Sequence, residues 1–394
     1  MRAMLLALAL VFSLPLPAQE RPGKPPQFRV GSLEEIFEDD SRVVVHYVTN
    51  RLLVGVDEGK PAWKSLVPDK LFLRATETPL AGHVVVKHDG SPDVENDSNL
   101  KHYAIETFKP SYKVRVFNQD DTLPFIGNEV KDDGMGFLHN LWRRDVLIYI
   151  HGFNNNWETA VRRAAQLKRD FKKLYKKDFS ILVYSWPSHG GSELFGLGGL
   201  AEYRDDERRY KQSLPAIATF MEAILMKDGG TQGRGQRWGL MHSMGNRAGL
   251  HGFAEFGRRM EAAKRPMPKD LFTRVVLAAP DMEVNDFKTH TDYLFQFCAK
   301  KKPVMYFHAT SNIAVNVSSG INLNDRAGVT PVLSDRLLTV DAKAAKSPLS
   351  ELGHGYYASN DKMLRLTADY LFNEGDPTKS PDLEAIPGDQ WRLK

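Results

Sequence analysis

The sequence predicts an α/β fold in which a mostly parallel central sheet is flanked by helices and continued by a strand-rich N-terminal region. Two patterns predict this fold. Across residues 145–372, short and almost wholly apolar runs alternate with longer segments of helical periodicity, the pattern of strands buried on both faces of a parallel sheet. Across residues 43–144, short β-like runs are separated by clusters of glycine, proline, aspartate and asparagine.

The expected strands follow from these runs. In the N-terminal region they are Val43–Val48, His83–Lys87, His102–Thr107 and Tyr112–Phe117. In the core they are Val146–Ile150, Ile181–Ser185, Trp238–His242, Val275–Ala279, Val304–His308 and Leu337–Val340. The core runs are separated by helical segments, as a parallel sheet requires.

The segment Trp157–Lys177 is expected to be an amphipathic helix. Its alanine, valine, leucine and phenylalanine residues recur at helical spacing, and Asn156 is a suitable N-cap. Lysine and arginine fill the opposite face. We expect that face to be solvated, and contact with an anionic envelope surface is the alternative.

The two ends of the chain are expected to lie outside the fold. Residues 1–18 have the layout of a secretory signal peptide, with Arg2, an apolar stretch and a small residue at Ala18 before the expected cleavage site. We therefore expect export to the periplasm or the extracellular space, and an uncleaved N-terminal anchor is the alternative. Residues 19–42 are expected to form a linker and residues 373–394 a C-terminal tail, because both segments are rich in proline.

Charge and cysteine content exclude several classes of function. The 53 Lys and Arg residues against 49 Asp and Glu leave a net charge of +4, so no nucleic-acid partner is expected. The one cysteine, Cys298, excludes a disulfide framework and a cysteine-rich metal site, and is expected to be a small buried apolar residue. The sequence has neither a His-Glu-x-x-His motif nor a phosphate-binding loop, so no metal and no cofactor are expected.

Ser243 is the predicted nucleophile. The segment Gly239–Gly245 ends an expected strand and opens an expected helix, so this serine sits in the sharp turn that raises a hydroxyl above the edge of a sheet. Gly245, Gly249 and Gly252 follow at spacings of four and three residues, which gives the helix a face without side chains for close approach to the sheet. Met241 departs from this pattern, because the residue two before such a serine is normally small.

His354 is the predicted base. In folds with this strand–serine–helix turn, the acid and then the histidine follow the serine along the chain. His354 stands in a glycine-flanked loop after the last expected core strand. His308 lies within a strand and is expected to be a core residue. The amides of Met244 and Phe153 are the expected oxyanion donors. His151, Gly152 and Trp186 are expected to contact the substrate.

Several short blocks resemble one known family. The blocks are His151–Asn155, Ser185–Ser188, His242–Asn246 and Ala278–Asp281, preceded by Tyr47–Arg51. They are similar to the signature blocks of an alpha/beta-hydrolase family that is catalogued only as having unknown function. The resemblance extends from about residue 43 to about residue 372, and it implies an alpha/beta-hydrolase fold of the serine esterase or lipase type. It also implies that Ser243 is the nucleophile and that the histidine belongs at the position of His354.

The chain departs from this family at the acid. Asn312 occupies the place of the acid that usually follows the seventh strand, and an amide can hold an imidazole but cannot stabilise an imidazolium by charge. Asp281, immediately after the Val275–Ala279 strand, is the predicted substitute. Asn312 itself, as a weak orienting residue, and Asp341 are the alternatives.

Together these features predict an exported serine hydrolase that cleaves a carboxylic ester or related small acyl compound. A peptidase, a thioesterase or an acyltransferase of the same fold are alternatives, and so is a non-catalytic binding protein, which Met241 and Asn312 favour. Four aromatic residues are expected to line an acyl pocket: Phe153, Trp157, Trp186 and Phe195. Gly190–Leu200 is interpreted as a mobile loop beside the site. The sequence leaves the oligomeric state open.

Overall fold

The computed structural model describes residues 41–57, 60–64, 80–91, 99–108, 112–113, 141, 144–175, 178–190, 197–225, 235–299, 304–345, 353–373, 376–388 and 390–394. All of them belong to the compact unit Glu35–Lys394. The predicted signal peptide and almost all of the predicted linker lie outside the described residues. Phe195 also lies outside them.

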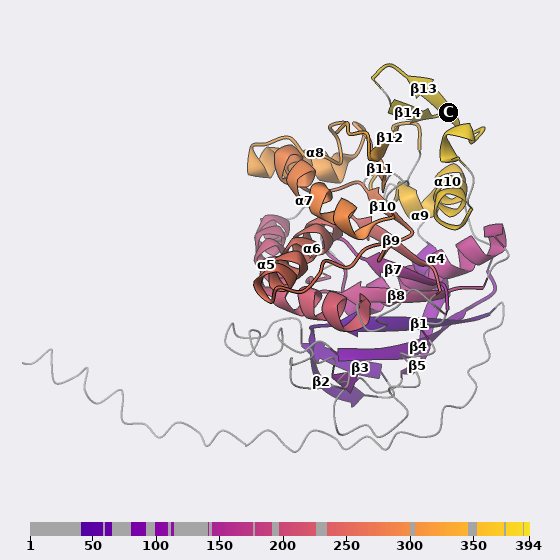
Figure 1. The fold of residues 1–394 in the computed structure, drawn as a ribbon. Helices are drawn as coiled ribbons and strands as arrows, with labels where there is room; N and C mark the ends of the chain where they lie inside the picture. The colour runs from indigo at the N-terminus through magenta and orange to yellow at the C-terminus, as the bar shows by residue number, and fades with distance from the viewer. Residues whose placement is uncertain are drawn as a thin grey trace, which may run out of the picture. The chain divides into compact units, whose positions relative to one another are not determined.

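A long mixed sheet organises this unit (Figure 1). Its order is β13-β14-β12-β11-β10-β9-β7-β8-β1-β4-β5, and β6 also pairs with β4. The core strands are β7 (Val146–Ile150), β8 (Ser180–Ser185), β9 (Arg237–His242), β10 (Arg274–Ala278), β11 (Val304–His308) and β12 (Leu337–Asp341). All neighbouring pairs among them are parallel. Every residue of these strands is buried, which confirms the expectation drawn from their apolar runs.

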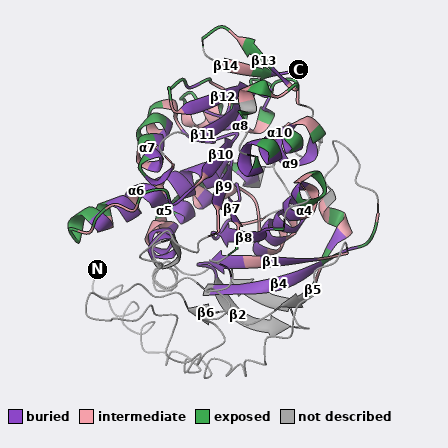
Figure 2. Cartoon of the chain, turned by 45° about the vertical axis from the view of Figure 1, so that its right-hand side comes forward, coloured by how far each residue is buried: buried purple, intermediate pink, exposed green. Residues whose placement is uncertain are grey.

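Helices cover both faces of the sheet (Figures 1 and 2). The helices are α4 (Trp157–Tyr175), α5 (Leu197–Leu225), α6 (Met244–Ala262), α7 (Val284–Phe297), α8 (Ile313–Asn322), α9 (Tyr356–Ser359) and α10 (Asp361–Phe372). One apolar cluster joins the sheet to α5, α6 and α7, and a second joins its other face to α4, α9 and α10. The predicted α/β fold with helices on both faces of a mostly parallel sheet is confirmed.

The N-terminal strands extend the same sheet. They are β1 (Arg42–Thr49), β4 (Leu80–His88), β5 (Tyr103–Phe108), which follows the short helix η1 (Asn99–His102), and β6 (Tyr112–Lys113). β1 runs parallel to β8, and β4 pairs antiparallel with β1, β5 and β6. A separate hairpin is formed by β2 (Leu52–Asp57) and β3 (Lys60–Lys64), which the sequence analysis did not identify.

The C-terminal segment differs from the expected tail. It contains the short helix η3 (Pro377–Lys379) and the strands β13 (Leu383–Ile386) and β14 (Gln390–Leu393). β14 runs parallel to β12, and Leu383 and Leu393 are buried against the core. The prediction of a tail was wrong because the segment is too short and too rich in proline to show strand periodicity, and its pairing depends on an edge that only the folded sheet provides.

The basic helix and the glycine-rich loop also differ from expectation. In α4 the side chains of Arg163 and Lys168 are buried rather than solvated. Arg163 donates a hydrogen bond to Gln166 Oε1, and Lys168 Nζ donates to the Val44 carbonyl over 3.4 Å. The basic face is therefore only partly solvated. Of the expected mobile loop, residues 191–196 lie outside the described part of the chain, and Leu197 already begins α5.

Two further observations concern burial. Cys298 is buried at the end of α7, as expected, and burial raises the pKa of its thiol to about 12. Among the described residues, no helix is both long and apolar enough to cross a membrane.

Candidate functional site

The site lies at the switch point in strand order, where successive strands are added on opposite sides of β7. After β7 the chain adds β8 on one side, and it then returns to add β9 on the other side. In open α/β sheets the loops that leave the carboxyl ends of two such strands diverge and leave a crevice for a ligand. The loop His151–Asn156 follows β7, and Ser243 follows β9.

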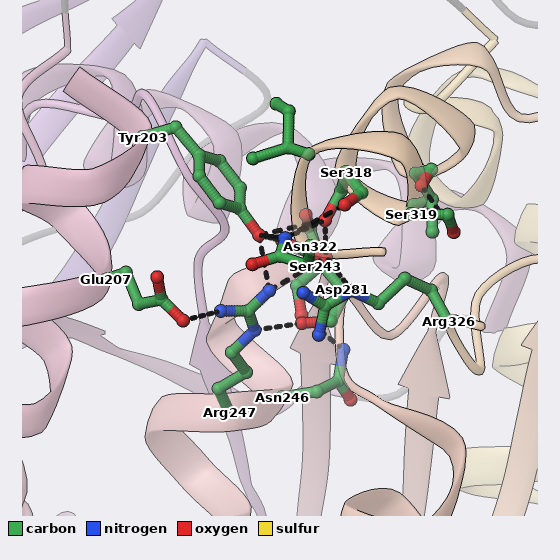
Figure 3. Close-up of polar contacts among 12 residues, drawn as sticks. Tyr203, Glu207, Ser243, Asn246, Arg247, Asp281, Ser318, Ser319, Asn322 and Arg326 are labelled. Atoms are coloured by element: carbon green, nitrogen blue, oxygen red, sulfur yellow. Dashed lines mark hydrogen bonds and ion pairs between the residues drawn. The ribbon is translucent and has the colours of Figure 1, made fainter. Parts of the chain in front are cut away.

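Ser243 occupies a strained turn between β9 and α6. Its φ of 55° and ψ of −127° lie in a region that residues with a side chain rarely adopt. Neighbouring groups hold this backbone in place: the Ser243 N–H donates to Ala278 O over 3.0 Å, and the Asn246 side chain donates to Ser243 O over 3.0 Å (Figure 3). This strained serine turn at a helix N-terminus is the geometry expected of a nucleophile.

Two glycines allow the loop after β7 to lie against this turn. A Cβ added at Gly152 would lie 2.8 Å from Ser243 Cβ, and one added at Gly245 would lie 2.4 Å from the His151 carbonyl. Met244 is the first residue of α6, so its N–H has no acceptor within the helix. Phe153 directly follows Gly152. The two expected oxyanion donors therefore come from backbone segments that meet at Ser243.

Met241 fits next to the turn because Gly249 leaves room for it. A Cβ added at Gly249 would lie 2.5 Å from Met241 Sδ and 3.1 Å from Ile150 Cδ1. Gly252, by contrast, faces Ile217 of α5, where a Cβ would meet Cγ2 at 2.3 Å. The glycine face of α6 thus receives a methionine from the sheet and an isoleucine from another helix.

His354 and Asn312 are in direct contact. The Asn312 side-chain nitrogen and oxygen lie 2.9 Å and 3.1 Å from His354 Nδ1. The same Asn312 oxygen accepts from the Val315 N–H over 3.2 Å and so caps α8. The structure therefore places Asn312, and not Asp281, against Nδ1 of His354.

His242 packs against His354, and the sequence did not predict this contact. Its ring stacks on Tyr357 at 4.2 Å between centroids and lies 4.4 Å from the His354 ring. Its Nε2–H donates to the His354 carbonyl over 3.2 Å. Burial, and secondly the charge of His354, lower the pKa of His242, so its ring is neutral and acts as a platform. The only signal in the sequence was its place directly before the serine.

Asp281 belongs to a separate buried network (Figure 3). Its carboxylate lies 3.0 Å from Arg247 Nη2 and 3.6 Å from Arg326 Nε, and it accepts hydrogen bonds from Tyr203 and Ser318. Burial by itself would raise the pKa of the Asp281 carboxyl, but the two guanidinium groups and the two hydroxyl donors lower it. The prediction that Asp281 orients His354 is corrected: two arginines hold its carboxylate instead.

Asp341, the remaining alternative for the acid, is also engaged elsewhere. Its carboxylate accepts from the Lys343 N–H over 2.9 Å and lies 3.3 Å from Arg392 Nε on β14. His308, in β11, is buried in the core as expected.

A cavity of about 260 Å³ opens beside Ser243. His354 and Phe153 line it together with Ser243, and so does Asp281. The rest of its wall comes from α5 and α8: Gly199, Leu200, Tyr203, Ala314, Val315, Val317, Ser318 and Ile321. Two of the four expected pocket aromatics lie elsewhere, since Trp157 packs on Tyr47 in the opposite core cluster and Trp186 is fully buried.

The three residues predicted to contact the substrate take part in the packing of the loop after β7. His151 is fully buried, stacks on Trp186 at 5.3 Å, and accepts a hydrogen bond on its carbonyl from Trp186 Nε1. Burial, and secondly the charge of Arg51, lower the pKa of His151 to about 3. Gly152 supplies close approach rather than a side chain. None of His151, Gly152 and Trp186 lines the described cavity, and their contact with the substrate stays a prediction.

Arg51 ties the blocks of the family resemblance together. Its fully buried guanidinium donates to the carbonyl of Ser188 over 2.9 Å, to that of Asn155 over 2.8 Å and to Ser185 Oγ over 3.1 Å. Burial lowers the pKa of Arg51 to about 9, and Asp206 opposes this shift. The segments Tyr47–Arg51 and Ser185–Ser188 thus hold the loop after β7 in place.

Comparisons with known proteins agree with this fold. A family model described as alpha/beta hydrolase of unknown function (DUF900) matches residues 131–369, more than half of the chain. That range includes four of the blocks noted in the sequence but not Tyr47–Arg51. A comparison with curated protein sequences gave no match.

Similar solved structures include an uncharacterised protein from Capnocytophaga ochracea DSM 7271, at 11% identity and a TM-score of 0.29, over 66% of this chain and 59% of that one. A thermostable esterase from Pseudomonas putida ECU1011 shares 13% identity, with a TM-score of 0.28, over 74% and 84% of the two chains. A mutant of the esterase rPPE in complex with (S)-Ac-CPA shares 13% identity, with a TM-score of 0.27, over 59% and 76%. The chain spans less than two thirds of the first of these proteins. On the extent of the family match, the chain belongs to the alpha/beta hydrolases of unknown function (DUF900).

Proposed function

We propose that this protein is a serine hydrolase that cleaves an uncharged carboxylic ester by way of an acyl-enzyme. The observation that carries the proposal is that Ser243, in its strained turn, shares one cavity with His354, whose Nδ1 is in contact with Asn312. A nucleophile, a base and an orienting group are the three parts that acyl transfer by a serine requires.

The proposed roles follow from these positions. Ser243 Oγ attacks the ester carbonyl while His354 takes its proton and passes it to the leaving alcohol. The N–H groups of Met244 and Phe153 hold the oxyanion that forms on the carbonyl oxygen. Water, activated by the same histidine, then hydrolyses the acyl-enzyme and restores the serine. Each step uses only groups of the chain and water.

Asn312 makes this a slow variant of such a site. An amide oxygen can accept from the Nδ1–H of His354 and so select the tautomer that acts as a base. It carries no charge with which to stabilise the imidazolium that forms on proton transfer. We therefore propose measurable but low turnover.

The cavity favours a small, apolar group on the substrate. Phe153, Val315 and Ile321 contribute apolar side chains to its wall. Among the described residues beside the cavity, the two arginines Arg247 and Arg326 are balanced by the carboxylates of Asp281 and Glu207, which does not favour an anionic substrate. A short acyl ester fits this lining better than a charged one.

A non-catalytic binding protein is the second candidate, and Asn312 is the observation that favours it. If the site no longer turns over, the same cavity would still bind a small apolar molecule. From the N-terminal sequence alone we also propose export to the periplasm or the extracellular space, and from the partly basic α4 helix a peripheral contact with an anionic envelope surface.

A fluorophosphonate probe tests the proposal directly. Wild-type protein should be labelled at one serine, and Ser243→Ala should abolish labelling, whereas Ser334→Ala, an exposed serine on a distant loop, should leave it unchanged. p-Nitrophenyl acetate, butyrate and octanoate, together with a matched thioester and an anilide, then rank ester, thioester and amide cleavage. Folded wild-type protein that neither reacts with the probe nor hydrolyses any of these compounds would favour the binding protein.

A further inference from the structure

Two histidines and an aspartate meet between α6 and α7, and none of them lines the described cavity. His251 lies on α6, and Asp286 and His290 lie four residues apart on α7, so that both α7 side chains project from the same face. None of the three takes part in the proposed ester hydrolysis.

The distances within this cluster suit a metal ion. His251 Nε2 lies 3.0 Å from Asp286 Oδ2, and His290 Nδ1 lies 3.0 Å from Asp286 Oδ1. One ligand atom from each residue lies within 4.8 Å of the other two. Around Zn²⁺, with bonds of about 2.0–2.1 Å, neighbouring ligand atoms are about 3.0–3.5 Å apart, so small side-chain rotations would bring all three into the first coordination shell.

The surroundings of the cluster leave it open to a hydrated ion. The side chains of His251, Asp286 and His290 are 16%, 37% and 21% exposed, which is neither the full burial of a core hydrogen-bond network nor the full exposure of surface residues. The His251 and His290 rings are 4.2 Å apart and nearly edge to face, and Tyr210 of α5 lies 5.7 Å from His251 on its other side. The rings are thus held near each other by packing.

We propose that His251, Asp286 and His290 bind a divalent transition-metal ion, with Zn²⁺ as the natural occupant, and that the ion clips α7 to α6. Two imidazoles and one carboxylate form a donor set that suits zinc and its neighbours in the transition series, whereas Mg²⁺ and Ca²⁺ prefer oxygen ligands. Water completes the coordination. The His290 Nδ1–H now donates to the Asp286 carbonyl over 2.9 Å, so binding through that atom breaks this hydrogen bond and moves the ring proton to Nε2.

The site acts on stability rather than on the reacting atoms. His251 lies eight residues beyond Ser243 along one helix, which corresponds to about 12 Å of helical rise, too far for an ion to touch the substrate. Because α6 begins directly after Ser243, an ion that ties this helix to α7 stabilises the element from which the turn projects. The proposal stands whether or not the protein hydrolyses esters.

Zinc titration of the tag-free full-length protein, freed of metal with a chelator and returned to buffer, is the test. Calorimetry should give one equivalent of Zn²⁺ bound, Co²⁺ should produce visible absorption bands from a nitrogen- and oxygen-ligated ion, and the Tm should rise with Zn²⁺ concentration. At a hundred-fold excess of free metal over the Kd, the folded state gains about a hundred-fold over the unfolded state.

Matched variants locate the site. His251→Ala and His290→Ala should each weaken Zn²⁺ binding at least ten-fold and remove the rise in Tm. His102→Ala, which removes a histidine 2.9 Å from the Asp89 carboxylate and outside this cluster, should leave both unchanged. The Co²⁺ spectrum is recorded on the wild type, so it tests metal coordination even if a substitution prevents folding. Absence of those bands, or Zn²⁺ binding that is equal in His251→Ala and wild type, overturns the proposal.

Discussion

Replacing Asn312 by aspartate exchanges the amide nitrogen beside His354 for an oxygen, and we expect it to raise the turnover of ester hydrolysis. The Asn312 side-chain nitrogen and oxygen both lie close to His354 Nδ1, at 2.9 Å and 3.1 Å. If the nitrogen donates, the proton of the imidazole is held on Nε2 and the ring cannot act as a base toward Ser243. A carboxylate can only accept, so it selects the Nδ1–H tautomer at all times.

The size of the gain follows from the charge that aspartate adds. A carboxylate about 4 Å from the imidazolium that forms during proton transfer stabilises it by about 4 kcal/mol at an effective dielectric constant of about 20. Asn312 is fully buried, and the cost of burying a charge there reduces this figure. The N-terminus of α8, which Asn312 caps through the Val315 N–H, returns about 0.3–1 kcal/mol. A net gain of about 1.4–4 kcal/mol corresponds to about a ten- to thousand-fold increase in kcat.

The assay compares kcat and kcat/KM for p-nitrophenyl acetate and butyrate between the wild type and Asn312→Asp. Gly320→Asp is the control, because it adds the same charge to α8 at an exposed position where a new Cβ would meet no atom within 4 Å. The control should change kcat by less than about two-fold, since an exposed charge is screened by water. An Asn312→Asp protein with the wild-type Tm but an equal or lower kcat would refute the role of Asn312 as the orienting group.

Three further substitutions test the packing around the nucleophile. Gly249→Ala should destabilise the fold because the new Cβ would lie 2.5 Å from Met241 Sδ, and adding Met241→Ala should recover part of the lost stability. Urea unfolding of the two single variants and the double variant measures the coupling between the two positions. Strictly additive changes in the free energy of unfolding would contradict the contact. Gly152→Ala should lower kcat about 100-fold and also lower the Tm, since its Cβ would lie 2.8 Å from Ser243 Cβ in a buried turn. An unchanged kcat would argue against close approach of this loop. Asp281→Asn should cost about 3–5 kcal/mol of stability at pH 7, because it removes the buried carboxylate that two buried guanidinium groups share and leaves Arg247 with Glu207 alone. Because the pKa of the Asp281 carboxyl is lowered in the folded state, its contribution to the free energy of unfolding is present above about pH 4 and is lost as the pH falls through the folded pKa. The difference in Tm between the variant and the wild type should therefore shrink in acid. A loss of activity at unchanged Tm would instead mark Asp281 as the acid of a triad.

The strands of the core could be predicted because each is specified locally. A strand buried on both faces needs an almost unbroken apolar run, and the runs at Val146–Ile150 and Val304–His308 coincide with β7 and β11. The same holds for Ser243, because a strand, a serine, a glycine and a helix follow one another in only a few residues. The β13–β14 hairpin carried no such signal, since its strands are four residues each and its pairing partner, β12, lies about 50 residues upstream.

The identity of the group beside His354 could not be predicted in this way. Asp281 and Asn312 each follow a neighbouring strand, and both were candidates on position alone. The orientation of each side chain depends on its surroundings. Arg247 of α6 and Arg326 of the loop after α8 bind the Asp281 carboxylate. The Asn312 side chain is oriented by the N-terminus of α8, which it caps. Both arginines are distant in sequence from the residue they bind.

The sequence by itself therefore determined the core strands of the sheet, the serine turn and the glycines that let two loops approach, because short-range patterns of burial and backbone freedom specify these features. Only the tertiary structure decided that Asn312 rather than Asp281 faces His354, that His242 supports it, and that His251 meets Asp286 and His290. Each of these contacts joins side chains from separate elements, and the direction of a side chain at such a junction depends on the charges and helix ends that the completed fold places around it.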